Sequence, residues 1–364
     1  MGSNIAVKSN IKNYSIVFLE ELIDLVENFK DENSFYLIDG SVHKLYPELL
    51  SHITEGKVLP LVANEELKTL AGAEIIFDFF LENNVNKKSN IFAIGGGVVQ
   101  DVVTLATHIF HRGLEWVYVP TTLLAMSDSC IGAKSAINYK GFKNPLGVFH
   151  PPKKVLLHPA FTKTLKYQDV LSGHGEIIKL GLIGNRNINS LQSINIEGLM
   201  LNGVINSHIL DTLILSSLLV KKEYVEEDEF DQGIRRILNY GHTFGHALES
   251  AMNNRIPHGQ AIIIGIDIVN YVSYRLGSMS EETFEDCRCC YDKLYGDLSL
   301  DSFEINSLFD RIHKDKKTIN GDVLLALMRT SGNFYLDPIS IEGELRPIFT
   351  DYLTEKNIFK LNAI

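Results

Sequence analysis

Three histidines, an arginine and an asparagine are concentrated in the segment RRILNYGHTFGHALESAMNNRIPH, residues 235–258. His242 and His246 are four residues apart, so on a helix their imidazoles share one face. Imidazole binds divalent cations, and this pattern with polar neighbours favours a metal-dependent active site, although a helix with two hydrogen-bonded core histidines has the same spacing. Gly241 and Gly245 stand directly before the two histidines, and we expect them to let a ligand approach the backbone.

A carboxylate that can complete such a site occurs in GHGEIIK, residues 173–179. Glu176 together with two imidazoles is a suitable ligand set for a catalytic zinc ion, which keeps one coordination position open. Glu176 and Lys179 are also one helical turn apart, as in a simple helix-stabilising ion pair. The spacing leaves both interpretations open.

A glycine-rich turn, GGGVVQD, follows the strand-like run at residues 91–94. Glycines between a strand and a helix let the backbone approach a pyrophosphate, whose charge is favoured at the helix N-terminus. Gln100 stands where the third glycine of GxGxxG would be. The turn therefore fits a nucleotide site, but also a tight turn packed against a sheet.

Polar and cationic side chains alternate with small and apolar residues between His111 and Pro152. Lysines and an arginine that converge in a cleft bind phosphate or carboxylate groups, and arginine can do so with two hydrogen bonds. Scattered surface lysines are the alternative. The polar residues of this run are Arg112, Thr121, Thr122, Asp128, Lys134, Lys143 and Asn144.

The elements that position these groups follow two patterns. In the first part of the chain, strand-like runs alternate with helical spacing, which predicts parallel strands joined by helices. These strands are expected over 34–39, 91–94 and 116–119, and the helices over 65–83 and 98–110. The second part is mainly helical, with helices expected over 175–183, 205–226, 237–252, 259–275 and 281–295 and a late strand or hairpin over 323–336. We therefore expect two domains, 1–158 and 159–364.

The bulk properties agree with a globular enzyme. A length of 364 residues favours two domains, and a net charge of -11 argues against binding to nucleic acid or anionic membranes. The N-terminus does not resemble a signal peptide, and no apolar run reaches the roughly 18 residues of a membrane span, so we expect a cytoplasmic protein. Cys287, Cys289 and Cys290 are expected to be reduced and to bind no metal.

Taken together, these segments resemble the dehydroquinate synthase family of sugar phosphate cyclases, in the same order and over nearly the whole chain. The matching pieces are GGGVVQD, RG at 112–113, VPTTLLA followed by Asp128, GAK at 132–134, KN at 143–144, GEIIK, KKEYVEEDE, RRILNYGHTFGHALE, HG at 258–259 and DKK at 315–317. The resemblance implies an α/β, Rossmann-like, NAD-binding N-terminal domain, a mainly α-helical metal-binding C-terminal domain and a homodimer.

The resemblance also implies which residues form the site. The divalent metal, zinc or alternatively cobalt, would be bound by Glu176, His242 and His258. His246 then becomes a catalytic residue on the substrate side, and the other catalytic residues are Lys134, Lys179, Arg235 and Asn239. The residues implied to bind substrate are Arg112, Lys143, Asn144, Lys221, Lys316 and Lys317. Those implied to bind NAD are Asp39, Glu65, Lys68, Gly95, Gly96, Gly97, Asp101, Thr121, Thr122 and Asp128.

The implied activity is that of a lyase in the shikimate pathway of aromatic amino acid biosynthesis. It converts 3-deoxy-arabino-heptulosonate 7-phosphate to 3-dehydroquinate and phosphate through transient oxidation by NAD, phosphate elimination, reduction and intramolecular aldol closure. The spacing of Arg235, Asn239 and His246 matches the family members whose substrate has a carboxylate. Gln100 and Gln260 depart from the usual pattern of these members, and GAKSAIN and FHPP resemble specialised cyclases that make 2-epi-5-epi-valiolone or 2-deoxy-scyllo-inosose.

Two other classes of protein remain as alternatives. NAD-dependent metal alcohol and glycerol dehydrogenases share this architecture but would accumulate NADH, and the KN, RRILN and DKK segments argue against them. A non-enzymatic binding module would be expected to lose the metal ligands, whereas all three are present.

Overall fold

The computed structural model describes residues 4–29, 32–51, 55–185, 207–252, 255–291, 305–313 and 318–356. The chain divides into two compact units, Met1–Lys166 with Ser207–Phe230, and Tyr167–Asn206 with Asp231–Ile364. The first is an α/β unit and the second is mainly helical. This division falls after the boundary proposed at residue 158, and it groups the helix at 207–227 with the first unit because that helix packs on the N-terminal part of the chain.

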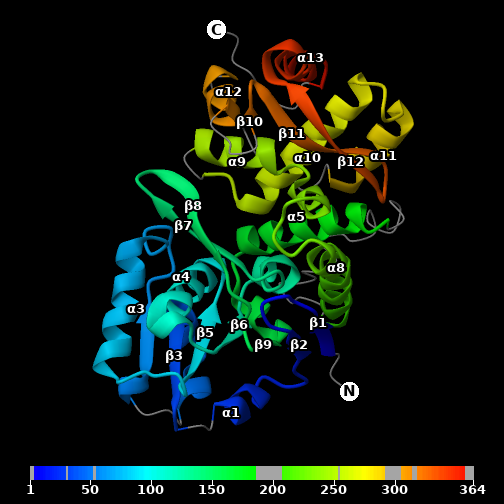
Figure 1. The fold of residues 1–364 in the computed structure, drawn as a ribbon. Coiled ribbons are helices and arrows are strands. Elements are labelled where there is room, and N and C mark those ends of the chain that lie inside the picture. Colours follow the sequence, from blue (N-terminus) through cyan, green and yellow to red (C-terminus); the bar gives the residue numbers. More distant parts are fainter. Residues whose placement is uncertain are drawn as a thin grey trace. The chain divides into compact units, whose positions relative to one another are not determined.

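A seven-stranded sheet forms the centre of the first unit (Figure 1), in the order β1-β2-β9-β6-β5-β3-β4. All neighbouring strands are parallel except β1 and β2. The strands are β1 (Asn4–Val7), β2 (Tyr14–Phe18), β3 (Ser34–Asp39), β4 (Val58–Leu61), β5 (Asn90–Gly95), β6 (Trp116–Pro120) and β9 (Lys154–Leu157). The three strands expected from the sequence are β3, β5 and β6, which are adjacent and almost entirely buried, as central parallel strands are.

Helices and a hairpin complete this unit, with α3 and α4 side by side in Figure 1. The helices are α1 (Asp24–Asn28), α2 (Gly40–Leu45), α3 (Leu70–Glu82), α4 (Gly97–Ile109) and α8 (Ser207–Glu227). Short 3-10 or π turns are η1 (Pro47–Leu50), η2 (Glu55–Lys57), η3 (Phe110–Arg112), η4 (Ala125–Ser129) and η5 (Pro159–Thr164). The helix expected to begin at Glu65 begins only at Leu70, because the Thr69 hydroxyl caps it by accepting a hydrogen bond from Gly72 N.

The first unit also has an antiparallel hairpin that was not expected from the sequence, formed by β7 (Lys134–Tyr139) and β8 (Phe142–Phe149). Its two-residue loop is Lys140-Gly141, and both residues have positive φ angles, 47° and 81°. A type I′ turn has this backbone and joins twisted antiparallel strands without splaying them. The glycine between two apolar positions was the signal for this turn.

In the second unit, α10 (His258–Arg275) is the central helix and is buried from Gly259 to Ser273. The other helices are α5 (Tyr167–Ile183), α9 (His242–Ala251), α11 (Glu281–Tyr291), α12 (Ile305–His313) and α13 (Arg346–Lys356), with short turns η7 (Ile234–Asn239) and η9 (Ile341–Leu345). An antiparallel sheet, β10-β11-β12, consists of Thr318–Ile319, Asp322–Thr330 and Asn333–Ser340. It confirms the hairpin expected over 323–336.

The single helix expected over 237–252 is wrong. Residues Ile234–Asn239 form the 3-10 turn η7, and α9 begins only at His242. Between them Gly241 has a φ of 78°, in the left-handed region where glycine carries no steric penalty. The break places His242 in the first turn of α9.

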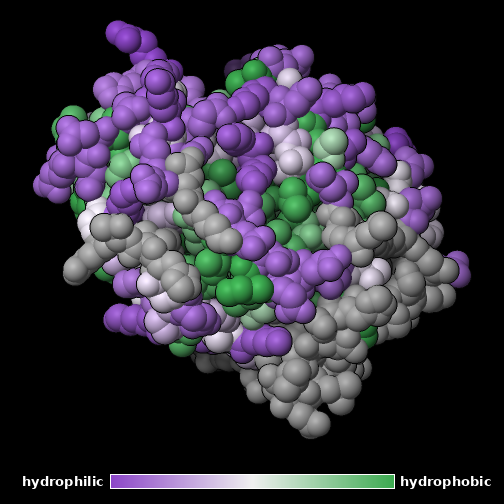
Figure 2. All heavy atoms as spheres, turned by 90° about the horizontal axis from the view of Figure 1, so that it is seen from below, coloured by the Kyte–Doolittle hydropathy of each residue, from purple (hydrophilic) through white to green (hydrophobic). Residues whose placement is uncertain are grey.

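The distribution of hydrophilic and hydrophobic residues on the surface is typical of a globular protein. Hydrophilic side chains cover much of the face seen in Figure 2, with hydrophobic residues in separate patches between them. Among the described residues no helix is both long and apolar enough to cross a membrane. Cys287 is a buried free thiol and Cys289 an exposed one, while the side chain of Cys290 lies outside the described residues.

Candidate functional site

Glycines let three helices of the second unit touch through their backbones. A Cβ on Gly175 of α5 would lie 2.4 Å from the carbonyl oxygen of Gly259 in α10. In α9, a Cβ on Gly245 would lie 2.7 Å from Ile262 Cδ1, and one on Gly241 would lie 2.6 Å from a side-chain carbon of Ile266. Gly241 and Gly245 therefore make room for α10, whereas they were expected from the sequence to make room for a ligand.

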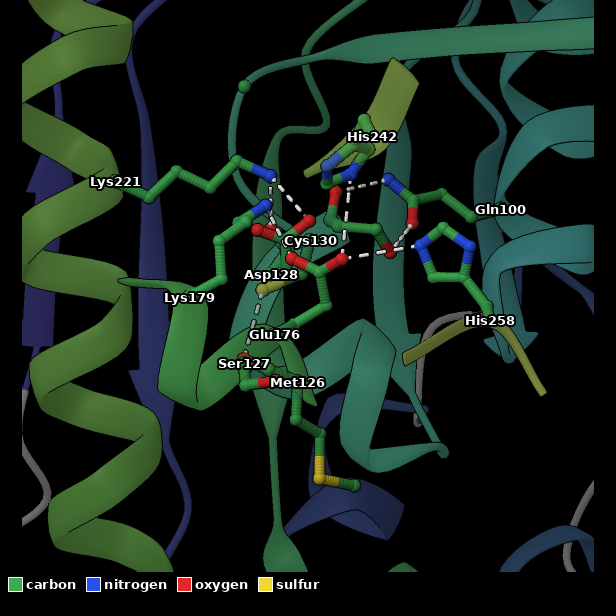
Figure 3. Close-up of polar contacts among 12 residues, drawn as sticks. Gln100, Met126, Ser127, Asp128, Cys130, Glu176, Lys179, Lys221, His242 and His258 are labelled. Carbon is green, nitrogen blue, oxygen red and sulfur yellow. Dashed lines mark hydrogen bonds and ion pairs between the residues drawn. The ribbon is translucent and has the colours of Figure 1, made fainter. Parts of the chain in front are cut away.

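This packing brings together the ionisable residues that adjoin those glycines in sequence. Glu176 is completely buried, and its Oε1 lies 3.5 Å from Nε2 of His242 and 3.3 Å from Nε2 of His258 (Figure 3). Its Oε2 forms an ion pair with the ammonium group of Lys179, one turn further along α5. The two interpretations of Glu176 left open by its spacing are thus compatible, because each carboxylate oxygen has its own partner.

The histidine rings form a compact triangle. The centroid of the His242 ring lies 5.2 Å from that of His246 and 5.7 Å from that of His258, and the last two lie 5.8 Å apart. One nitrogen of each ring lies within 4.8 Å of the others, a spacing at which they can hold a metal ion. His246, expected to act on the substrate side, therefore lies in the same cluster as the two expected ligands.

Burial and charge act in opposite directions on the pKa values in this cluster. Burial raises the pKa of Glu176, but the Lys179 ammonium and the hydrogen bond with His258 outweigh it, so the net pKa is lowered. Burial lowers the pKa of His258, but hydrogen bonds to Glu176 and Glu249 outweigh it, so the net pKa is raised. The cluster holds its charges through mutual pairing.

Arg235 and Asn239 lie near the two ends of η7, which leads through Tyr240 and Gly241 into α9. Arg235 is buried, with 3% of its surface exposed, and Asn239 is half-buried. Both residues thus come directly before the helix that carries His242 and His246.

The proposed NAD residues of the first unit lie along one edge of its sheet. Asp39 ends β3, Gly95 and Gly96 join β5 to α4, and Thr121 and Thr122 follow β6. The carboxyl ends of neighbouring parallel strands are where nucleotides bind in such sheets.

The three glycines of the turn have different surroundings. A Cβ on Gly95 would lie 2.6 Å from Val99, and one on Gly96 would lie 2.8 Å from Thr122. A Cβ on Gly97, the first residue of α4, would meet nothing within 4 Å. Only Gly97 therefore has open space beside the helix N-terminus.

Three of the expected NAD contacts are engaged in a network inside this unit. Asp101 Oδ2 lies 2.8 Å from Lys68 Nζ, and its Oδ1 accepts a hydrogen bond of 3.1 Å from Ala136 N in β7. Glu65 Oε2 accepts one of 2.8 Å from Asn138 Nδ2. Burial raises the pKa of Asp101 despite the charge of Lys68. These side chains join the 65–68 loop and α4 to the β7–β8 hairpin.

A second network explains Gln100. Its Nε2 donates to the Ser129 carbonyl at 2.7 Å, and its Oε1 accepts from the Ser129 hydroxyl at 2.6 Å. Next to Ser129, Asp128 receives Lys221 Nζ at both its carbonyl oxygen, 2.8 Å, and its Oδ2, 2.9 Å (Figure 3). Asp128 was expected to bind NAD and Lys221 to bind substrate, whereas the structure pairs them with each other. The anchoring of η4 by Gln100 was not expected from the sequence.

The other residues expected to bind substrate, together with the expected catalytic residue Lys134, lie on two parts of the first unit or outside the described residues. Arg112 is exposed in η3 with a φ of 61°. Lys134, Lys143 and Asn144 are exposed on the β7–β8 hairpin. Lys316 and Lys317 lie outside the described residues.

Comparisons with known proteins cover most of the chain. The family model "3-dehydroquinate synthase N-terminal" matches residues 58–172, and "3-dehydroquinate synthase C-terminal" matches residues 173–318. A 3-dehydroquinate synthase of Clostridium tetani is 35% identical over 305 residues, which cover 82% of this chain and 81% of that protein.

Two solved structures have the same fold. A 2-deoxy-scyllo-inosose synthase complexed with carbaglucose-6-phosphate, NAD+ and Co2+ has a TM-score of 0.84 at 24% identity, over 95% of this chain and 99% of that one. The 2-epi-5-epi-valiolone synthase of Streptomyces hygroscopicus subsp. jinggangensis 5008, with NAD+ and Zn2+ bound, has a TM-score of 0.82 at 23% identity, over 97% and 99%.

Proposed function

Since this chain belongs to the 3-dehydroquinate synthase family, we propose that it converts 3-deoxy-arabino-heptulosonate 7-phosphate to 3-dehydroquinate and phosphate. The observation that carries this proposal is the buried Glu176 carboxylate, with one oxygen facing Nε2 of both His242 and His258. NAD and a divalent metal, zinc or cobalt, are the proposed cofactors. We also propose that the protein is a cytoplasmic homodimer. Sedimentation equilibrium would measure the mass of the assembly.

The donor spacing fits a zinc site. Ligands bound tetrahedrally to zinc at about 2.1 Å are roughly 3.4 Å from one another. The two oxygen–nitrogen distances are 3.5 and 3.3 Å, so the donors are already at ligand spacing. We therefore assign Glu176, His242 and His258 as the ligands, where the bound metal would polarise a substrate hydroxyl and favour loss of hydride to NAD+.

Lys179 has a defined part in this arrangement. Its ammonium is buried beside Glu176 Oε2 and keeps the carboxylate ionised, so that Oε1 is available as a donor. A buried carboxylate without such a partner would take up a proton. Lys179 therefore maintains the charge of the ligand set.

The first unit supplies the features that dinucleotide binding requires. The open space at Gly97 and the N-terminus of α4 suit a pyrophosphate. Asp39 ends β3, and an acidic residue there suits the ribose hydroxyls. NAD would take up a hydride in the first step and return it after phosphate has left, so the cofactor is not consumed.

The other roles follow from the reaction. Oxidation of the substrate acidifies the neighbouring C–H bond, the substrate's own phosphate removes that proton, and phosphate leaves with the bonding electrons. Reduction, ring opening and aldol closure follow. We assign Arg235 to the substrate carboxylate, because a buried guanidinium binds it with two charge-assisted hydrogen bonds. His246 is assigned to proton relay, since imidazole titrates near neutral pH.

The test compares three substrates. Metal-loaded protein and NAD+ are incubated with 3-deoxy-arabino-heptulosonate 7-phosphate, sedoheptulose 7-phosphate or glucose 6-phosphate, and phosphate and NADH are measured separately. We expect phosphate only from the first substrate, without accumulation of NADH. Phosphate only from a substrate that lacks a carboxylate would contradict the substrate assignment and support a specialised cyclase, whereas stoichiometric NADH would identify a dehydrogenase.

A further inference from the structure

Both imidazoles that face Glu176 are also held on their opposite side. His242 Nδ1 lies 3.2 Å from the carbonyl oxygen of Tyr240, and His258 Nδ1 lies 3.3 Å from Glu249 Oε2. The carbonyl can only accept a hydrogen bond, so His242 donates Nδ1–H, and Nε2, which faces Glu176, is the nitrogen placed to bind a metal. In a metal-bound site, His258 would donate Nδ1–H to Glu249 in the same way.

Glu249 stands on the same face of α9 as the other site residues. His242, His246 and Glu249 follow one another at intervals of four and three residues, so their side chains form one stripe along the helix. The Glu249 side chain is only 11% exposed. A carboxylate is costly to bury unless it is paired and hydrogen-bonded, and Glu249 forms an ion pair with the imidazole of His258.

We propose that Glu249 is a positioning residue for the metal site. By accepting the hydrogen bond from His258 Nδ1–H it fixes the orientation of the ring and makes Nε2 a better electron donor. The proposal rests on the proposed function only in its metal ligands, Glu176, His242 and His258.

The position of His258 supports this role. Its Nε2 lies 3.3 Å from Glu176 Oε1 and its Nδ1 lies 3.3 Å from Glu249 Oε2, so the ring stands between the two buried carboxylates. Tyr240 holds His242 through its backbone carbonyl, which no substitution of its side chain removes. Glu249 holds His258 through its side chain, so its substitution tests whether such a hydrogen bond strengthens metal binding.

The experiment uses Glu249→Ala and Glu249→Gln in the full chain, stripped of metal with a chelator. Zn2+ and Co2+ affinities are measured by competition with a chromogenic chelator, and the Co2+ absorption spectrum is recorded. We expect Glu249→Ala to bind either metal roughly 10- to 100-fold more weakly. Glu249→Gln should lose less, because its amide oxygen can still accept the hydrogen bond but carries no charge.

Glu342→Gln is the matched control. Glu342 also pairs with a histidine in this unit, 3.0 Å from Nε2 of His313, but it is 59% exposed and belongs to no part of the proposed site. We expect its metal affinity to equal that of the wild type, and NAD+ affinity to be unchanged in all three variants. If Glu249→Ala fails to fold by circular dichroism, the near-isosteric Glu249→Gln decides.

Wild-type metal affinity and an unchanged Co2+ spectrum in a folded Glu249 variant would overturn the proposal. So would a wild-type protein that binds neither metal. A wild-type protein that binds metal tightly but releases no phosphate from any of the three sugar phosphates would instead contradict the proposed function and leave the role of Glu249 intact.

Discussion

Gly175→Ala tests whether the contact between α5 and α10 sets the spacing of the proposed metal ligands. The new Cβ would lie 2.4 Å from the oxygen, 2.8 Å from the carbonyl carbon and 2.9 Å from Cα of Gly259. These are backbone atoms, which cannot rotate away. Because contacts of this kind need roughly 3.5 Å, the two helices must separate locally by about 1 Å.

The sign of the change in unfolding free energy shows whether the new methyl group meets the Gly259 backbone or open space. In an unconstrained helix interior, alanine is about 0.8–1 kcal/mol more favourable than glycine. Overpacking a tight contact costs about 1–3 kcal/mol. We therefore expect Gly175→Ala to lower the free energy of unfolding by up to about 2 kcal/mol, measured by urea denaturation of the metal-free protein.

The effect of Gly175→Ala on metal affinity and on the reaction rate should be larger than its effect on stability. Glu176 follows Gly175 directly, and its Oε1 lies 3.3 Å from His258 Nε2 in the opposite helix. Metal ligands tolerate displacements of about 0.2 Å, and a misplacement of about 1 Å costs roughly 100-fold in rate. Gln168→Ala, at an exposed position of the same helix, is the control and should change neither the free energy of unfolding nor the metal affinity. A Gly175→Ala protein with raised stability and unchanged metal affinity would refute the packing argument.

Three further predictions concern other parts of the chain. Arg235→Ala should lower kcat/KM by roughly 100-fold or more, as expected when a buried carboxylate loses its partner, with metal affinity unchanged; loss of metal would show that the role is misplaced. Gln100→Ala removes both hydrogen bonds to Ser129 and should lower the unfolding free energy by about 1–3 kcal/mol in denaturant titrations; an unchanged value would contradict the anchoring of η4. Burial lowers the pKa of His150 from 6.5 to about 4, so between these values the unfolded chain holds the extra proton. The free energy of unfolding therefore decreases as the pH is lowered from 6.5 to 4, by at most roughly 3 kcal/mol. His150→Gln should flatten that part of the stability curve, and an unaltered slope would assign it to other groups.

Local sequence patterns predicted helices and strands well where almost every residue of the element is buried. The strands at 34–39, 91–94 and 116–119 were predictable because β3, β5 and β6 are continuous apolar runs. The break at Gly241 was not, because the apolar spacing continues through η7 and a 3-10 turn leaves no gap in that pattern.

The site was less predictable than the fold. Helical spacing alone pairs His242 with His246, and His258 joins them only because α10 packs against α9 through glycines. The pairing of Gln100 with Ser129 and of Lys221 with Asp128 joins residues far apart in sequence, where no spacing rule applies. The resemblance to a known family supplied the proposed ligand set, which spacing left open.

The number of phosphates released for each NAD+ supplied tests the proposed reaction most directly. Metal-loaded protein, freed of bound nucleotide, receives less NAD+ than protein and an excess of 3-deoxy-arabino-heptulosonate 7-phosphate. The account predicts many phosphates for each NAD+, with no NADH left at the end, because the hydride returns to the substrate. One phosphate or fewer for each NAD+, with an equal amount of NADH, would contradict it.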